Sequence, residues 1–93
     1  MSKKIIIDDI FLKNIPTLDL HGYTGDMARV ATKDFINDNL ILKNPKILIV
    51  HGIGEGIVKK SVHEELSHNK YVYSYCLNGF NTGCTIVNLK IEK

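Results

Sequence analysis

The chain has 93 residues, of which 44% are apolar and 24% charged, with two cysteines and a formal net charge of +2. A chain of this length buries roughly 60 to 65% of its unfolded surface, which excludes a second domain and a deep pocket under a separate lid. The whole charge excess lies in residues 46–93 and falls short of the basic footprint of a dedicated nucleic-acid-binding domain.

No apolar run is long enough to cross a membrane. The longest runs, residues 5–7 and 47–50, are far below the ~20 residues of a membrane helix. Asp8 and Asp9 also interrupt the N-terminal run before it reaches the length of a secretory signal. With two cysteines in an otherwise ordinary core, we expect a cytoplasmic protein with reduced thiols and no membrane partner.

Residues 1–15 mix charged residues and apolar triplets without a sustained period. We expect them to form an N-terminal arm or edge strand, followed by one domain over residues 16–93. Alternation over residues 17–21 predicts a strand that is buried on one side, with Asp19 and His21 on its polar face.

A helix is predicted after this strand. Thr24 is a suitable N-cap, and Pro45 ends the helix because it lacks an amide and disfavours helical geometry in the residue before it. Apolar residues at helical spacing predict its buried face, namely Ala28, Ala31, Phe35 and Leu42. The β-branched and leucine run at residues 46–50 then predicts a central parallel strand.

A glycine-rich loop at residues 52–56 precedes a second predicted helix. Its buried face is expected at Val58, Val62 and Leu66, and its exposed face at Lys59, Lys60, His63 and Glu64. His63 and His68 are expected to be solvated. Two alternating strands follow at residues 71–77 and 84–91, joined by a turn rich in asparagine and glycine.

The last two strands carry aromatic and sulfur side chains. Tyr71, Tyr73 and Tyr75 alternate and are predicted to project from one sheet face, where they stack bases or, more simply, pack half-buried. Cys76 and Cys84 would lie opposite each other in a symmetric hairpin. That geometry permits a disulfide, although reduced thiols fit the composition better.

The order β-α-β-α-β-β predicts an α/β fold of the α+β two-layer sandwich type. Right-handed crossovers place both helices on one face of a mixed four-stranded sheet. The other face of the sheet is expected to stay open.

Two strand ends share one pattern. The first and second predicted strands run into His21-Gly22 and His51-Gly52, and each then leads to a helix. Because the carboxyl ends of parallel neighbours meet at one edge of a sheet, we expect both histidines at that edge, near helix N-termini. Helix N-termini offer unpaired amides and a partial positive charge, which suit phosphate.

The glycine-rich loop extends this predicted phosphate site. Gly52, Gly54 and Gly56 let a phosphodiester approach the backbone without a β-carbon in the way, and Lys59 and Lys60 add positive charge. The spacing matches neither the dinucleotide-binding fingerprint nor a Walker loop.

The polar residues near the first strand leave several interpretations open. A single histidine after a strand is more often structural than catalytic, and two in matching contexts favour function. Asp19 either orients the imidazole of His21, as carboxylates do beside catalytic histidines, or braces a neighbouring loop. Asp19, His21 and His51 would form a metal site only if they converge in space.

Three segments occur in order along the chain: LDLHG at residues 18–22, IVHGIGEGIVKK at residues 49–60, and N-x-G-x-T-I-V-x-L at residues 81–89. Together they resemble the Smr (small MutS-related) domain family, over about residues 16–91. The resemblance implies a stand-alone member whose fold is similar to the C-terminal domain of translation initiation factor three. It also implies endonucleolytic cleavage or nicking of DNA or RNA.

By this resemblance, the first family motif falls on Asp19 and His21, and the glycine-rich motif falls on His51, Gly52 and Gly54. His51 stands where many members carry threonine. We expect no MutS-type ATPase or clamp in this chain, so targeting would come from a partner, an oligomer or the substrate itself.

The sequence therefore predicts an endonuclease that cleaves phosphodiester bonds of RNA or DNA, with RNA slightly preferred. The predicted catalytic residues are Asp19, His21 and His51, and the predicted phosphate-binding residues are Gly22, Gly52, Gly54, Gly56, Lys59 and Lys60. His21 would act as general acid or base. No metal is needed if RNA is cut through its own 2′-hydroxyl, whereas metal-assisted hydrolysis would use Mg²⁺ or Mn²⁺.

The alternative function is a non-catalytic module that uses the same loop to bind nucleic acid or a ribosome-like surface. The expected partners are RNA or DNA, and a ribosome or another targeting protein. A small-molecule phosphate binder is a third, weaker alternative.

Overall fold

The computed structural model describes residues 15–53, 56–79 and 82–91. Its elements are β1 (Thr17–Asp19), α2 (Gly25–Ile41), β2 (Lys46–Val50), α3 (Ile57–His68), β3 (Val72–Leu77) and β4 (Cys84–Leu89). The predicted order of strands and helices is confirmed. The predicted arm or edge strand over residues 1–15 lies outside the described residues, apart from Ile15.

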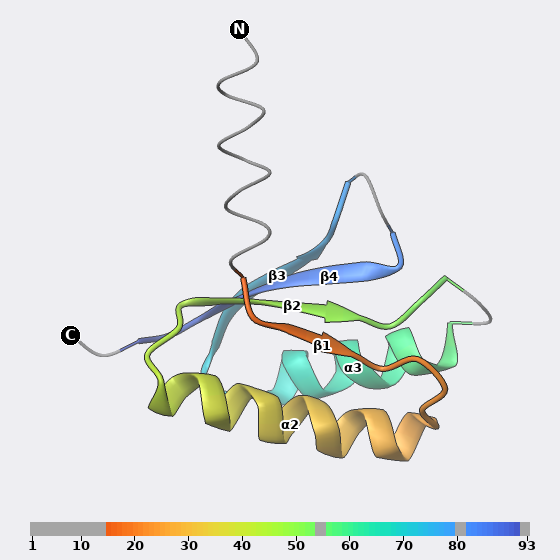
Figure 1. The fold of residues 1–93 in the computed structure, drawn as a ribbon, viewed down its shortest axis with the longest axis horizontal. Coiled ribbons are helices and arrows are strands. Elements are labelled where there is room, and N and C mark those ends of the chain that lie inside the picture. Colours follow the sequence, from red (N-terminus) through yellow and green to blue (C-terminus); the bar gives the residue numbers. More distant parts are fainter. Residues whose placement is uncertain (1–14, 54–55, 80–81, 92–93) are drawn as a thin grey trace, which may run out of the picture.

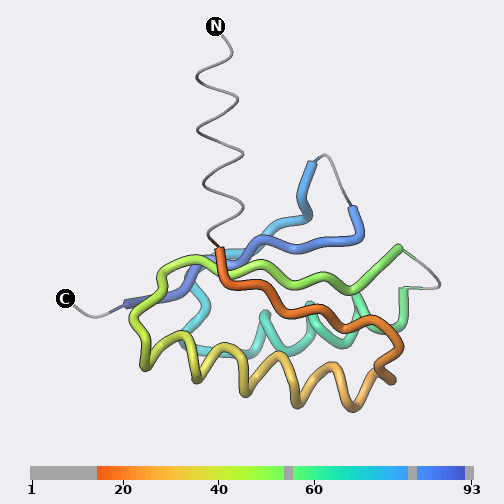
Figure 2. Tube along the Cα trace, in the orientation of Figure 1, coloured from red at the N-terminus to blue at the C-terminus, as the bar shows by residue number. Residues whose placement is uncertain are grey.

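The four strands form one mixed sheet in the order β1-β2-β4-β3. β1 runs parallel to β2, and β4 runs antiparallel to both of its neighbours. Both helices lie against the same face of this sheet (Figure 1), and the chain trace shows β1 beside β2 along its length (Figure 2). The predicted two-layer sandwich is therefore confirmed. Neither of the described helices is long and apolar enough to span a membrane.

The core lies between the sheet and the two helices. Its fully buried members come from all layers and include Leu20, Ile36, Ile47, Ile49, Val62, Leu66 and Val87. Burying one such side chain contributes roughly 1.5–3 kcal/mol. The in-register pairs Ile47 with Val87 and Ile49 with Thr85 line the face of the sheet that the helices cover.

The N-cap and the end of α2 follow from local chemistry. The hydroxyl of Thr24 accepts the backbone N–H of Met27 at 3.2 Å, as an N-cap does. The helix ends at Ile41, and Lys43 then takes a positive φ of 59°. Leu42 is therefore past the last helical turn and is 68% exposed, so its predicted burial is wrong.

β3 carries a β-bulge between Val72 and Ser74 that sequence alternation did not predict. Tyr75 pairs with Val87 and packs against the core, whereas Tyr73 is 75% exposed. The prediction that the three tyrosines share one face is wrong, because the bulge interrupts the alternation.

The hairpin register also separates the two cysteines. Cys76 pairs with Ile86, so Cys76 and Cys84 are not opposite each other as the symmetric hairpin predicted. Both thiols are free, with Cys76 exposed and Cys84 buried.

The two helices approach each other closely near their N-termini. A β-carbon built on Gly25, the first residue of α2, would lie 2.7 Å from the side-chain oxygen of Ser61 in α3. Real β-carbons do not tolerate such a distance. Ser61 is itself buried, so its side chain has little room to move.

We predict that Gly25→Ala destabilises the fold by about 1–3 kcal/mol through overpacking between α2 and α3. Ser61→Ala should relieve the clash, so the double variant Gly25→Ala/Ser61→Ala recovers most of the loss in a denaturant unfolding experiment. Gly79→Ala is the matched control, because a β-carbon there meets no atom within 4 Å. Equal stability of both single glycine variants would contradict the prediction.

Candidate functional site

The segment after β1 forms a tight turn that presents His21. The backbone N–H of Tyr23 donates to the carbonyl of Leu20 at 3.0 Å, which closes the turn. Gly22 occupies the third position of this turn with a φ of 78°, which favours glycine. The carboxylate of Asp19 accepts the backbone N–H of His21 at 3.0 Å. His21 therefore stands exposed at the corner of a turn that Asp19 and Gly22 build.

The end of β2 lies beside this turn. β1 and β2 are parallel neighbours in register from Thr17 with Leu48 to Asp19 with Val50, so both strand-histidine-glycine segments reach the same edge, as predicted. The backbone N–H groups of His51 and Gly52 both donate to the carbonyl of Gly83 at 2.9 Å.

The His51 side chain turns under the sheet and enters a hydrogen-bond network. Its Nδ1 lies 2.9 Å from the carbonyl oxygen of Gly52, and its Nε2 lies 2.7 Å from the hydroxyl of Thr85. The Nε2 of His63 lies 2.8 Å from the same hydroxyl. Thr85 thus joins a strand histidine to a helix histidine.

The donors in this network follow from its chemistry. A carbonyl only accepts, so Nδ1 of His51 carries a proton and donates to Gly52. In a neutral His51 ring, Nε2 then accepts from Thr85, and the Thr85 oxygen accepts from Nε2–H of His63. Both ring nitrogens of His51 are occupied, so exchange of a proton with a substrate would break one of these bonds.

His63 is the clearest error of the sequence prediction. It was expected on the solvated face of the second helix, but its ring lies between the rings of His51 and Tyr75, at centroid distances of 5.8 and 5.1 Å. Burial lowers the pKa of His63 below its ordinary value, and the nearby His51 and Lys59 lower it further. His68 is exposed, as predicted.

One sequence signal could have found part of this network. Thr85 alternates with Val87 and Leu89 on the buried face of β4 and is fully buried. A buried polar side chain needs a hydrogen-bond partner. Nothing local to His63 indicates that it supplies one of the partners of Thr85.

Within the described residues, the first amide groups of α3 have no hydrogen-bond partner. Gly56 precedes the helix with a φ of 82° and makes no side-chain cap. The N–H of Lys60 is bonded to the carbonyl of Gly56 at 2.9 Å, so the amides before Lys60 lie ahead of the first intrahelical bond. Together with the helix dipole, these amides favour an anion.

A cavity of about 460 Å³ lies between the N-termini of both helices. Its lining combines the first residues of α2, the end of β2 and the first turn of α3: Tyr23, Thr24, Gly25, His51, Gly52, Ile53, Gly56, Ile57, Val58 and Lys59. We call it the helix-terminus cavity. Ile53 and Ile57 are 72% and 60% exposed, so its wall also offers apolar surface.

A second hollow of about 400 Å³ adjoins this cavity and shares Gly56 and Lys59 with it. Lys60, His63, Glu64 and Ser67 complete its lining. Arg29 of α2 pairs with the carboxylate of Glu64 at 2.7 Å, which offsets the negative charge that Glu64 brings to this hollow.

The structure thus places the predicted site residues in three groups. His51, Gly52, Gly56 and Lys59 line the helix-terminus cavity, and Lys60 lines the adjoining hollow. Asp19, His21 and Gly22 form the turn that precedes Tyr23 on the cavity wall. Gly54 lies outside the described residues.

Asp19, His21 and His51 do not form one ligand cluster. Within residues 15–53, 56–79 and 82–91, no group of three histidine, cysteine or carboxylate side chains is placed to hold a metal ion. Asp19 and Cys84 both pair with Val50, one on each side of β2. Burial raises the pKa of the Cys84 thiol, and the Asp19 carboxylate raises it further.

Comparison with known proteins identifies the fold family. The family model of the Smr domain matches residues 18–90. The chain belongs to the Smr domain family. Endonuclease MutS2 of Lacticaseibacillus casei is 35% identical to this Smr domain over 77 residues, which are 80% of the chain and 10% of that protein. Endonuclease MutS2 of Streptococcus equi subsp. equi is 36% identical over 75 residues, 77% of the chain and 10% of that protein.

Solved structures agree with this assignment. The Smr domain of Thermus thermophilus MutS2 superposes with a TM-score of 0.78 at 24% identity, over 81% of this chain and 98% of that one. YdaL, a stand-alone small MutS-related protein from Escherichia coli, superposes with a TM-score of 0.75 at 25% identity, over 80% and 63%. The Smr domain described here spans about a tenth of the length of the MutS2 relatives.

We predict that the lowered pKa of His63 makes stability depend on pH. Unfolding restores the ordinary pKa of 6.5, so above that pH His63 is neutral in both states and its contribution is complete. As the pH falls below 6.5, the unfolded state binds the proton first and the free energy of unfolding drops until the lowered folded pKa is passed. His63→Gln should flatten this drop in thermal unfolding between about pH 5 and 7.

The exposed His68 of the same helix provides the control for this experiment. His68→Gln should keep the pH profile of the unaltered protein. Identical profiles for His63→Gln and the unaltered protein would contradict the prediction.

We also predict that Asp19→Asn speeds the alkylation of Cys84. Burial raises the pKa of the Cys84 thiol most, and the Asp19 carboxylate raises it further. A neutral residue at position 19 removes the second contribution and so increases the fraction of thiolate, which is the reactive form. Mass spectrometry of iodoacetamide-treated protein measures both thiols, with the exposed Cys76 as the internal control. An unchanged rate at Cys84 would show that the two side chains do not interact.

Proposed function

We propose that this Smr domain is a nucleic-acid endonuclease, with RNA slightly preferred over DNA as substrate. The observation that carries the proposal is the helix-terminus cavity, where the uncapped start of α3, Gly52 and Lys59 meet beside the turn that exposes His21. Its MutS2 relatives bear the name endonuclease. An anion site next to an exposed acid-base group is what phosphodiester cleavage requires.

The phosphate would bind at the start of α3. Unpaired backbone amides after Gly56 donate to its oxygens, and Lys59 neutralises charge that develops in the transition state. The glycine at position 52, with a φ of 84°, keeps a β-carbon away from this surface. Ile53 and Ile57 would contact the sugar or base next to the phosphate.

His21 is the better candidate for proton transfer, and His51 for positioning. The His21 ring is exposed and makes no hydrogen bond to another described residue, so it is free to meet a substrate hydroxyl. Both nitrogens of His51 are engaged with Gly52 and Thr85. His51 would therefore hold the loop, while Asp19 fixes the backbone at His21 and contributes a negative charge.

For RNA, the substrate supplies its own nucleophile. His21 would take the proton of the 2′-hydroxyl, whose oxygen attacks phosphorus while the bond to the 5′-oxygen breaks. The 5′-oxygen would leave with a proton taken from solvent, so that a 2′,3′-cyclic phosphate and a 5′-hydroxyl result. Cleavage with Mg²⁺ or Mn²⁺ would leave a 5′-phosphate instead.

The weak charge of the chain bears on its partners. A net charge of +2 supports modest affinity for nucleic acid that falls with salt. A ribosome or another protein would then bring the domain to its substrate. We place this activity in the cytoplasm, where the two free thiols stay reduced.

We predict that His21→Ala lowers cleavage of end-labelled RNA about 10²- to 10⁴-fold, the usual contribution of a general acid or base. Binding of the same RNA should be retained. Lys59→Gln should weaken both binding and cleavage, because it removes the cation at the cavity. His68→Ala, at an exposed histidine distant in sequence from the cavity, should cleave normally.

Assays with and without EDTA, on RNA and on DNA, decide between the routes by the ends of the products. Binding without cleavage by the unaltered protein under every metal condition would contradict the endonuclease. It would favour the alternative of a binding module that uses the same cavity.

A further inference from the structure

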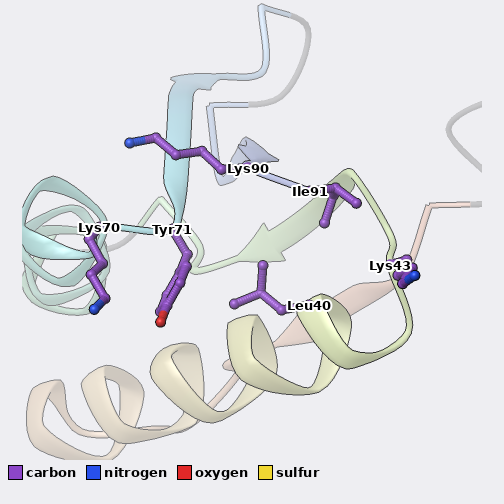
Figure 3. A pocket seen from close by; sticks show the side chains of 6 residues that line it. All are labelled: Leu40, Lys43, Lys70, Tyr71, Lys90 and Ile91. Carbon is purple, nitrogen blue, oxygen red and sulfur yellow. The ribbon is translucent and has the colours of Figure 1, made fainter. Parts of the chain in front are cut away.

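A larger cavity lies at the opposite end of the sheet from the candidate site. Its volume is about 630 Å³, and its lining is Leu40, Lys43, Lys70, Tyr71, Lys90 and Ile91. These residues come from three places: the end of α2, the α3–β3 connection and the segment after β4 (Figure 3). We call it the tyrosine–lysine cavity. No function assigned above uses it.

The charge of this lining is of one sign. Among the residues that the structure describes, the lining includes three lysines and no carboxylate. Lys43 follows the cap of α2 and has a positive φ of 59°. Lys90 is held through its backbone N–H, which donates to the carbonyl of Tyr71 at 2.8 Å. Such a cluster favours a ligand with more than one negative charge.

The rest of the lining is apolar and aromatic. Tyr71 is 42% exposed, and its backbone N–H donates to the side chain of Asn69 at 2.9 Å, which fixes the start of the strand. The ammonium of Lys70 lies 5.2 Å from the centre of the Tyr71 ring. In Figure 3, Lys70 is on one side of this ring, and Leu40 and Ile91 lie on the other.

We propose that the tyrosine–lysine cavity binds single-stranded nucleic acid, with one base stacked on Tyr71 and its flanking phosphates at Lys43 and Lys90. The volume of about 630 Å³ lies within the range of cavities that hold small ligands, and Figure 3 shows Leu40 and Ile91 across from the side of the Tyr71 ring that Lys70 leaves open. Stacking on an aromatic side chain next to lysines is the usual mode for unpaired bases. A duplex keeps its base faces covered and would lose this contact.

An acidic peptide is the competing ligand, because it would also satisfy three lysines. The carboxylates of such a peptide would not stack on the exposed face of an aromatic ring. The lining of the cavity also contains no arginine, the side chain that binds a carboxylate through two hydrogen bonds. The combination of a ring, apolar walls and single-point cations therefore favours a nucleotide over a peptide.

This site extends the proposed function, since a strand held there would have a second contact far from the helix-terminus cavity. Its test does not need cleavage. Binding by variants of the tyrosine–lysine cavity is measured separately from cleavage by His21→Ala. Either proposal can therefore fail while the other stands.

The test measures fluorescence anisotropy of a labelled oligouridylate about ten nucleotides long with the full chain. Tyr71→Leu should weaken binding at least about fivefold, the lower range for loss of one base stack. Lys43→Gln/Lys90→Gln should weaken binding and lower the salt dependence. Tyr73→Leu and Lys33→Gln are the matched controls, since both side chains are exposed and outside the cavity.

Amide spectra recorded during the same titration show where the strand binds. Changes should include Leu40, Lys70 and Lys90, and the thermal unfolding of each variant reports whether it folds. Equal weakening by Tyr71→Leu and Tyr73→Leu, or amide changes confined to the helix-terminus cavity, would overturn the proposal. So would displacement of the RNA by an oligoglutamate of equal charge, which would assign the cavity to acidic peptides.

Discussion

The parallel pairing of β1 with β2 is the constraint on which the site depends. The N–H of Leu20 still bonds the carbonyl of Val50 at 2.9 Å after β1 has ended, so both strands reach their last residues at the same level. Each strand then turns back into a helix below the sheet, which brings two helix N-termini together. Gly25 permits that approach, since a side chain there would meet Ser61. His51 reaches Thr85 through the neighbouring register of β2 with β4, and a shift of that register by one residue would turn His51 away from Thr85.

The Thr85 hydroxyl links the site to the packing of α3. One oxygen serves two histidines, and its proton can go to only one of them. The order of donors, from His63 through Thr85 to His51, therefore fixes the His51 tautomer and the position of the Gly52 carbonyl. A change in the packing of α3 against the sheet would therefore alter the glycine loop through these three hydrogen bonds.

The fold could be predicted from the sequence because each element has its own local signal. Alternation and the Thr24 cap are local signals, and they gave the right order of elements. The end of α2 was predicted less well, because the helix stops at Ile41, ahead of Pro45. The sequence also predicted that the two strand-histidine segments reach the same edge of the sheet, because this requires only that β1 and β2 are parallel neighbours.

The errors arise where contacts distant in sequence decide the outcome. His63 turns inward because of the way α3 is rotated about its axis against β4. The spacing of apolar residues along α3 predicts this rotation only to within one residue. The place of Tyr75 depends on a bulge that appears only when β3 pairs with β4. The tyrosine–lysine cavity joins residues near positions 40, 70 and 90, which no single window contains.

The same bulge has a consequence for the edges of the sheet. In the order β1-β2-β4-β3, the outer strands are β1, with three residues, and β3, whose ladder is interrupted at Tyr73. An open strand edge is a template for the addition of another chain, and short or bulged edges resist it. Both outer strands of the described sheet are thus poor templates for the addition of another chain through its backbone.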